Sequence, residues 1–181
     1  MQRKSEKRKI AADTSALISL AVGSKLEECL EIFDIVISER VREELEEISD
    51  YSDKHAEGAE LVLDIISNGG ITVESVTGDS QVSELLVEHR KVDYGEAETA
   101  LMAERNSIPI MITDDFKSLG DLKESFAEVK IHLSVFAIAR LVVKDKISKD
   151  EAETTLEKIA KERSWEGAAL FRHAKRYIED L

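Results

Sequence analysis

Acidic residues follow two apolar runs of this sequence, at positions where carboxylates could take part in chemistry. Asp13 ends the run RKIAAD (8–13), and Asp114 and Asp115 directly follow IPIMIT (108–113). In open parallel α/β sheets, binding and catalytic sites form at the carboxyl ends of the strands. If the two runs are neighbouring strands, these acids share one edge of the sheet. Taken singly, each acid is better explained as the N-cap of the helix that follows it.

A glutamate on a predicted helix adds to this group. In ERVREELEEISD (39–50) an apolar stripe is formed by Val41, Leu45 and Ile48, and Glu44 falls inside it. An inward carboxylate is costly unless it is paired or binds a metal ion. Glu44 is therefore the most informative glutamate of this helix.

A second glutamate lies in VDYGEAETALMA (92–103). Glu96 precedes small residues on the face that should meet the sheet. Asp93 and Glu96 also have the spacing of a capping box, in which Glu96 would only bond back to the start of its helix. Together with the strand-end acids and Glu44, a shared acidic pocket is the better explanation.

The chemistry of such a pocket follows from its charge. Carboxylates crowded together repel one another, and their charged forms persist only if a cation offsets them. Ligation by oxygen alone selects hard divalent ions such as Mg²⁺ or Mn²⁺. A site of this kind can activate a bound water and stabilise charge on a phosphoryl group. The acids therefore predict phosphodiester hydrolysis.

The elements that must position these acids alternate along the chain. Short β-branched runs recur between stretches of helical period, a pattern typical of an α/β fold with a central parallel sheet. The expected strands are 8–13, 33–38, 70–76, 108–113 and 128–133, and the expected helices lie near 15–31, 39–49, 53–67, 80–91, 94–106 and 116–125.

After residue 133 the pattern becomes helical to the end of the chain. The segment SVFAIARLVV (134–143) is apolar on nearly every face, which predicts burial in the chain or against a partner. Ser148 and Glu151 have the spacing of a capping box, and a last helix is expected from about Trp165. We expect one α/β domain over 1–133 and a helical extension over 134–181 packed on it.

Composition limits the classes of function. The net charge of −13 argues against a generally basic surface for nucleic acid. Two basic groups leave room for local contacts: the leader (Arg3, Lys4, Lys7, Arg8, Lys9) and a C-terminal cluster (Arg163, Arg172, Lys175, Arg176). Cys29 is the only cysteine, which excludes an internal disulfide and a thiolate zinc cluster. No membrane span and no signal peptide is expected, so a cytoplasmic protein is predicted.

Four segments, in the order ADTSALISL, VREEL, GEAETALMA and PIMITDDFKSL, resemble the PIN-domain nucleases. That family includes the toxin ribonucleases of VapBC toxin–antitoxin pairs. The likeness covers residues 8–131 and implies a three-layer α/β/α fold. It implies catalytic roles for Asp13, Glu44, Glu96 and Asp115, metal binding by Asp13, Glu96, Asp114 and Asp115, and ligand positioning by Thr14 or Ser15.

These expectations combine into one hypothesis about function. The chain would be an endoribonuclease that depends on Mg²⁺ or Mn²⁺ and cuts single-stranded or exposed RNA. The resemblance also implies a homodimer and, if the chain is a toxin, an antitoxin protein as partner. The alternative is a PIN-like module that binds RNA or protein without cutting it.

Overall fold

The fold is built on a parallel sheet of five strands in the order β3-β2-β1-β4-β5. The computed structural model describes residues 7–76, 79–165 and 167–181. Each adjacent pair of strands is parallel. Because β1 and β4 are neighbours, the acids that follow these two strands lie at the same edge of the sheet. The strands are β1 (Arg8–Ala12), β2 (Phe33–Ser38), β3 (Thr72–Glu74), β4 (Ile110–Ile112) and β5 (Lys130–His132).

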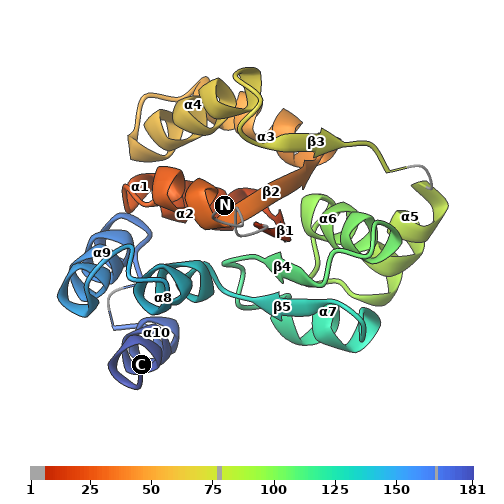
Figure 1. The fold of residues 1–181 in the computed structure, drawn as a ribbon. Helices are drawn as coiled ribbons and strands as arrows, with labels where there is room; N and C mark the ends of the chain where they lie inside the picture. Colours follow the sequence, from red (N-terminus) through yellow and green to blue (C-terminus); the bar gives the residue numbers. More distant parts are fainter. Residues whose placement is uncertain (1–6, 77–78, 166) are drawn as a thin grey trace, which may run out of the picture.

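Helices cover both faces of the sheet, which gives three layers (Figure 1). On one side lie α5, α6 and α7, and on the other lie α1, α2, α4 and the C-terminal helices. The helices are α1 (Thr14–Val22), α2 (Leu26–Ile32), α3 (Glu39–Ser49), α4 (Lys54–Ser67), α5 (Asp79–Glu88), α6 (Tyr94–Arg105), α7 (Leu119–Ser125), α8 (Val135–Val143), α9 (Lys149–Glu162) and α10 (Ala169–Glu179).

Alternation along the strands divides the core between the two faces. Ile10 and Ala12 of β1 join the hydrophobic cluster on the α1 side, whereas Ala11 joins the cluster on the α6 side. Successive side chains of a strand point to opposite faces, so one strand supplies both cores. This confirms the predicted three-layer α/β/α architecture.

The prediction of one helix over 15–31 is wrong. The chain forms α1 and α2, separated by a turn in which Ser24 has a φ of 55°. At Gly23 a Cβ atom would lie 2.9 Å from the Cδ1 atom of Ile159, so α9 approaches the backbone closely at the break. Because the residues on both sides of the turn are apolar, the sequence pattern suggested one continuous helix.

Other boundaries also differ from the prediction. The strand expected over 70–76 is limited to Thr72–Glu74, and the helix expected from 116 begins at Leu119. The last helix begins at Ala169 rather than near Trp165. Trp165 instead lies buried in the preceding turn, where it packs in the main core.

The C-terminal helices share the main core with the first half of the chain. Residues of α8, α9 and α10 belong to the same cluster as β1 and α1. The apolar segment 134–143 is largely covered within the chain, although Val143 at the end of α8 is 51% exposed. No helix among the described residues has the length and apolar character to cross a bilayer. Arg3 and Lys4 of the basic leader lie outside the described residues.

The extension is also fastened by a lysine. Lys25, between α1 and α2, donates to Glu28 at 2.8 Å and to Glu151 of α9 at 2.6 Å. The predicted capping box at Ser148 is half formed, because the Ser148 hydroxyl accepts from the Glu151 N–H while the Glu151 carboxylate binds Lys25. The acid expected to close its own helix therefore joins two distant parts of the chain.

Candidate active site

Asp13 lies at the junction of β1 and α1 and is 4% exposed. Its Oδ2 atom accepts hydrogen bonds from the Ser15 N–H at 3.1 Å and the Ser15 hydroxyl at 2.6 Å. Burial raises the pKa of Asp13 from 3.8 to about 6, and the charges of Asp93 and Glu44 add to the increase, while the bonds from Ser15 oppose it. Asp13 is thus both the N-cap of α1 and a buried acid at the sheet edge.

Glu96 lies in the first turn of α6 and is fully buried. The predicted capping box is formed: Asp93 Oδ1 accepts from the Glu96 N–H at 2.8 Å, and Glu96 Oε2 accepts from the Asp93 N–H at 3.2 Å. The other oxygen, Oε1, accepts from the Ser118 hydroxyl at 2.5 Å. Burial raises the pKa of Glu96 to about 8, and the negative charges of Asp13 and Asp93 add to it. Glu96 is therefore a member of the capping box and also a buried acid within electrostatic reach of Asp13.

Thr113 connects these two acids. Its hydroxyl group follows β4 and lies 3.3 Å from Asp13 Oδ2 and 3.1 Å from Glu96 Oε1. One hydroxyl hydrogen can be donated to only one of these carboxylates at a time. Thr113 and Ser118 were not predicted as parts of the site, since a hydroxyl group after a strand carries little signal in a single sequence.

Glu44 reaches the same region from α3. Its Oε2 accepts from the Thr14 hydroxyl at 2.7 Å, and its Oε1 accepts from Arg40 Nε at 3.2 Å. A Cβ atom on Gly95 would lie 2.6 Å from Glu44 Oε1, so the carboxylate approaches the start of α6 where only glycine leaves room. Partial burial raises the pKa of Glu44, and Asp93 adds to the increase, while Thr14 and Arg40 oppose it.

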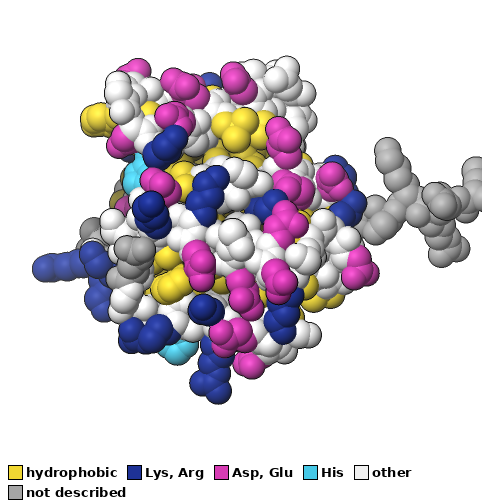
Figure 2. Space-filling model, turned by 90° about the vertical axis from the view of Figure 1, so that its left-hand side faces the viewer, with side chains coloured by type: hydrophobic (Ala, Val, Ile, Leu, Met, Phe, Trp, Pro, Cys, Tyr) yellow, Lys and Arg dark blue, Asp and Glu magenta, His cyan; other side chains and the backbone are white. Residues whose placement is uncertain are grey.

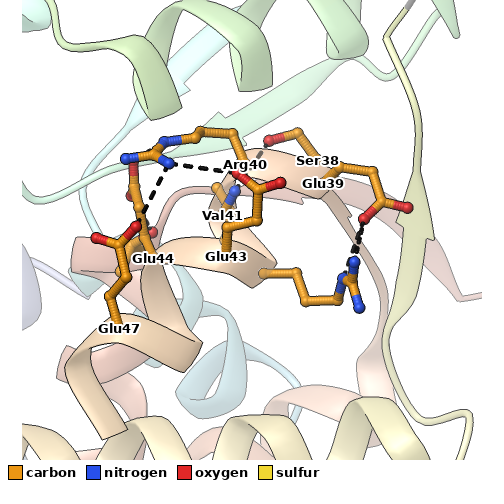
Figure 3. Close-up of polar contacts among 9 residues, drawn as sticks. Ser38, Glu39, Arg40, Val41, Glu43, Glu44 and Glu47 are labelled. Atoms are coloured by element: carbon orange, nitrogen blue, oxygen red, sulfur yellow. Dashed lines mark hydrogen bonds and ion pairs between the residues drawn. The ribbon is translucent and has the colours of Figure 1, made fainter. Parts of the chain in front are cut away.

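Arg40 organises the acidic side chains of α3. Figure 3 shows its guanidinium extended along the helix toward Glu43, Glu44 and Glu47. Glu43 and Glu47 are more than half exposed, as the helical pattern predicted, whereas the Glu44 side chain is 21% exposed. Only Glu44 of these three therefore faces the acidic edge of the sheet.

The two aspartates after β4 point to different neighbours. Asp114 is buried, and its Oδ1 accepts from the Ser134 N–H at 2.8 Å at the start of α8. Its Oδ2 is buried without a hydrogen-bond partner among the residues that the structure describes. Asp115 is partly exposed, and its Oδ1 accepts from the Lys117 N–H at 2.8 Å within its own turn. The backbone N–H of Asp114 also donates to the Ser15 hydroxyl at 2.8 Å, which holds the turn against α1.

The structure therefore brings Asp13, Glu44 and Glu96 to one edge of the sheet, and it adds Asp93. The charge of Asp93 acts on all three of these carboxyl groups. The sequence marked Asp93 only as a capping residue, because a helix cap and a site acid have the same signature there. The Thr14 hydroxyl donates to Glu44 and the Ser15 hydroxyl donates to Asp13, so both hydroxyl groups predicted to position a ligand bind acids of the edge.

The donors at this edge suit a hard divalent cation. They are carboxylate oxygens, and buried carboxylates that raise one another's pKa are stabilised in the charged form by a nearby cation. Across residues 7–76, 79–165 and 167–181, no group of three or more acids, histidines or cysteines is placed as metal ligands. The fit to a divalent cation therefore rests on the type of donor, carboxylate oxygen, and not on a formed cluster.

The comparison with known families agrees with this geometry. The family model described as DUF3368: PIN domain matches residues 9–180, nearly the whole chain. The protein therefore belongs to the PIN-domain family, a fold of nuclease type, and the match extends through the C-terminal helices. Among curated proteins, none matches the chain.

Proposed function

We propose that this protein is a ribonuclease that depends on a divalent metal ion and hydrolyses phosphodiester bonds in single-stranded or exposed RNA. The observation that carries the proposal is the pair of buried acids, Asp13 and Glu96, joined by the Thr113 hydroxyl at the carboxyl ends of β1 and β4. Buried carboxylates with raised pKa values are characteristic of functional sites. Membership of the PIN-domain family supports the same chemistry.

Each residue of the acidic edge has its own role in this proposal. Asp13 and Glu96 would hold Mg²⁺ or Mn²⁺, with Asp114 and Asp115 as further ligand candidates, and Glu44 would complete the cluster or act as a base. When bound, the ion supplies an acidified water and offsets charge on the phosphoryl group. The hydroxyl groups of Ser15, Thr14 and Ser118 orient the acids, each through a bond of 2.5–2.7 Å.

Two finer proposals come from the family resemblance. The first is that the protein is a toxin with an antitoxin partner, and the second is that it works as a homodimer. Light scattering tests the dimer directly, and a monomer at high concentration would refute it. A gene for a small DNA-binding protein in the adjacent reading frame would support the toxin role.

A cleavage assay tests the main proposal. Purified protein is incubated with a labelled single-stranded RNA, with Mn²⁺ or with EDTA, and Asp13→Asn is compared with Asp34→Asn. Asp34 is exposed on β2, near the amino end of the sheet, and serves as a matched control. We expect cleavage only with the metal ion, retained by Asp34→Asn and lost by orders of magnitude in Asp13→Asn. Cleavage that persists in Asp13→Asn would refute the catalytic role of Asp13. RNA that the parent binds but never cleaves with Mn²⁺ would favour the alternative, a PIN-like module that binds without cutting.

A further inference from the structure

A cavity of about 290 Å³ lies one helical turn away from the acidic edge. It is lined by Ile18, Ile48, Tyr51, Asp53, His55 and Arg163. Ile18 follows Thr14 by one turn of α1, and Ile48 follows Glu44 by one turn of α3, so the cavity adjoins the Thr14–Glu44 contact. Figure 2 faces the side of the molecule on which α1, α4 and α9 come together in Figure 1.

Arg163 is the cation of this cavity. It follows α9, and its guanidinium makes no hydrogen bond or ion pair with the described residues, although it lies within electrostatic reach of Asp114 and Asp13. Burial lowers its pKa, and the two aspartates oppose that change. A partly buried guanidinium without direct partners loses hydration and gains little in return, so an anion that supplies acceptor oxygens would be bound favourably.

The walls of the cavity suit a flat, apolar group beside that anion. Tyr51 is 70% exposed, while Ile18 is 2% exposed and forms an apolar floor. His55 Nε2 lies 3.3 Å from the Glu162 carbonyl oxygen, so the start of α4 and the end of α9 are held together at the cavity. Asp53 is the one acid of the lining, and its Oδ1 is engaged by two N–H groups at the start of α4, which reduces its effect on a bound anion.

We propose that this cavity is a subsite for one nucleotide of the RNA strand, with Arg163 bound to a phosphate and Tyr51 stacked on the base. The inference rests on the proposed function and names where its substrate lies. The volume is near the roughly 300 Å³ at the lower end of small-ligand pockets, which suits one nucleotide. Stacking on an aromatic side chain requires an unpaired base, so the subsite selects single-stranded RNA over duplex.

On a protein with a net negative charge, a local cation favours such a contact with RNA. The chain carries a net charge of −13, and the acidic edge repels a polyanion. Arg163 places a cation beside that edge from the C-terminal half of the chain, where a strand crossing toward Asp13 would meet it. The C-terminal helices thereby supply part of the substrate site rather than only a support for the core.

The test measures binding without cleavage. A short, fluorescently labelled single-stranded oligoribonucleotide is titrated with the full-length protein in EDTA, and its anisotropy gives Kd. Arg163→Gln and Tyr51→Ala are compared with Arg176→Gln and Tyr177→Ala, matched variants of exposed residues on α10. We expect Kd to rise about tenfold or more in each subsite variant and to stay near the parent value in the controls.

A structural role for Arg163 alone predicts another pattern. If Arg163 only balances Asp114, Arg163→Gln would change thermal stability and leave Kd unchanged, and Tyr51→Ala would have no effect, which would overturn the proposal. Should Arg163→Gln not fold, Arg163→Lys keeps the charge but loses the forked hydrogen bonds, and it should still weaken binding. Tyr51→Ala must weaken binding of the single strand more than of a duplex, and equal effects would also overturn the proposal.

The same data separate this inference from the proposed function. RNA that binds through Arg163 and Tyr51 but is never cleaved with Mn²⁺ would refute the nuclease and keep the subsite. Cleavage that requires Asp13, with binding indifferent to Arg163 and Tyr51, would refute the subsite and keep the nuclease.

Discussion

Replacing Asp13 with Asn removes one negative charge from the acidic edge, and the structure gives the size of the effect. The pKa of Asp13 is about 6 in the folded protein against an ordinary 3.8. That difference corresponds to about 3 kcal/mol. Because the folded state holds this proton more tightly, the stability contribution of the carboxyl group is fully present below about pH 4 and is lost as the pH rises through about 6.

Asn keeps an acceptor for the first turn of α1 but does not titrate. The bonds from Ser15 to the carboxylate lower the pKa of Asp13 and are therefore already included in the value of about 6. Without metal, we therefore expect Asp13→Asn to match the parent below about pH 4 and to exceed its free energy of unfolding by about 3 kcal/mol above pH 7.

The assay is urea unfolding of the metal-free proteins at several pH values, with Asp34→Asn as the control. Differences between variants cancel the titration of carboxyl groups that do not interact with Asp13. The charge of Asp13 raises the pKa of Glu96, so this pKa falls in Asp13→Asn and the change adds to the gain in stability. Added Mn²⁺ should stabilise the parent more than Asp13→Asn, because a ligand stabilises the state that binds it. A variant less stable than the parent at every pH, or an equal Mn²⁺ effect on both proteins, would refute the reasoning and leave Asp13 as a helix cap only.

Two further predictions concern the neighbours of the acids. Gly95→Ala places a Cβ atom 2.6 Å from Glu44 Oε1, so cleavage and Mn²⁺ affinity should fall, whereas Gly120→Ala, with open space around it, should leave both unchanged in the same assays. Ser118→Ala removes the hydroxyl that donates to Glu96 at 2.5 Å, so the pKa of Glu96 should rise further. In urea unfolding above neutral pH, the free energy of unfolding should fall by about 1–3 kcal/mol. Unchanged stability would show that the bond contributes nothing.

The fold was largely predictable because its pattern is local. Alternation of short apolar runs with helical stretches identified all five strands of the sheet. The pairing of β1 with β4 was only a condition for a shared acidic edge, and the structure meets it. The break between α1 and α2 was missed because the apolar residues on both sides of Gly23 and Ser24 suggested one continuous helix. The close approach of Ile159 of α9 to Gly23 joins residues far apart in the sequence, and no local signal marks that contact.

The inward placement of Glu44 was predictable from the sequence, but the contacts of the candidate site were not. Helical phase alone placed Glu44 inward, and the structure shows it against Gly95. The different directions of Asp114 and Asp115 depend on the Ser134 N–H at the start of α8, which no local pattern near residue 114 specifies. Asp93 was assigned only a capping role. It is exposed, and the effect of its charge on Asp13, Glu44 and Glu96 follows from the fold and not from a local pattern.

The capping box in the first turn of α6 protects two backbone amides, and their exchange can be measured. Glu96 accepts from the Asp93 N–H, and Asp93 accepts from the Glu96 N–H, so both amides are protected from exchange by carboxylates of the acidic edge. The Asp93 amide binds Oε2 of Glu96, whereas Oε1 accepts from Ser118 and Thr113. An ion that binds Glu96 through Oε1 therefore leaves the Asp93 amide protected, and one that takes Oε2 exposes it. Hydrogen–deuterium exchange at Asp93, compared with and without Mn²⁺, thus reports which oxygen of Glu96 the ion uses.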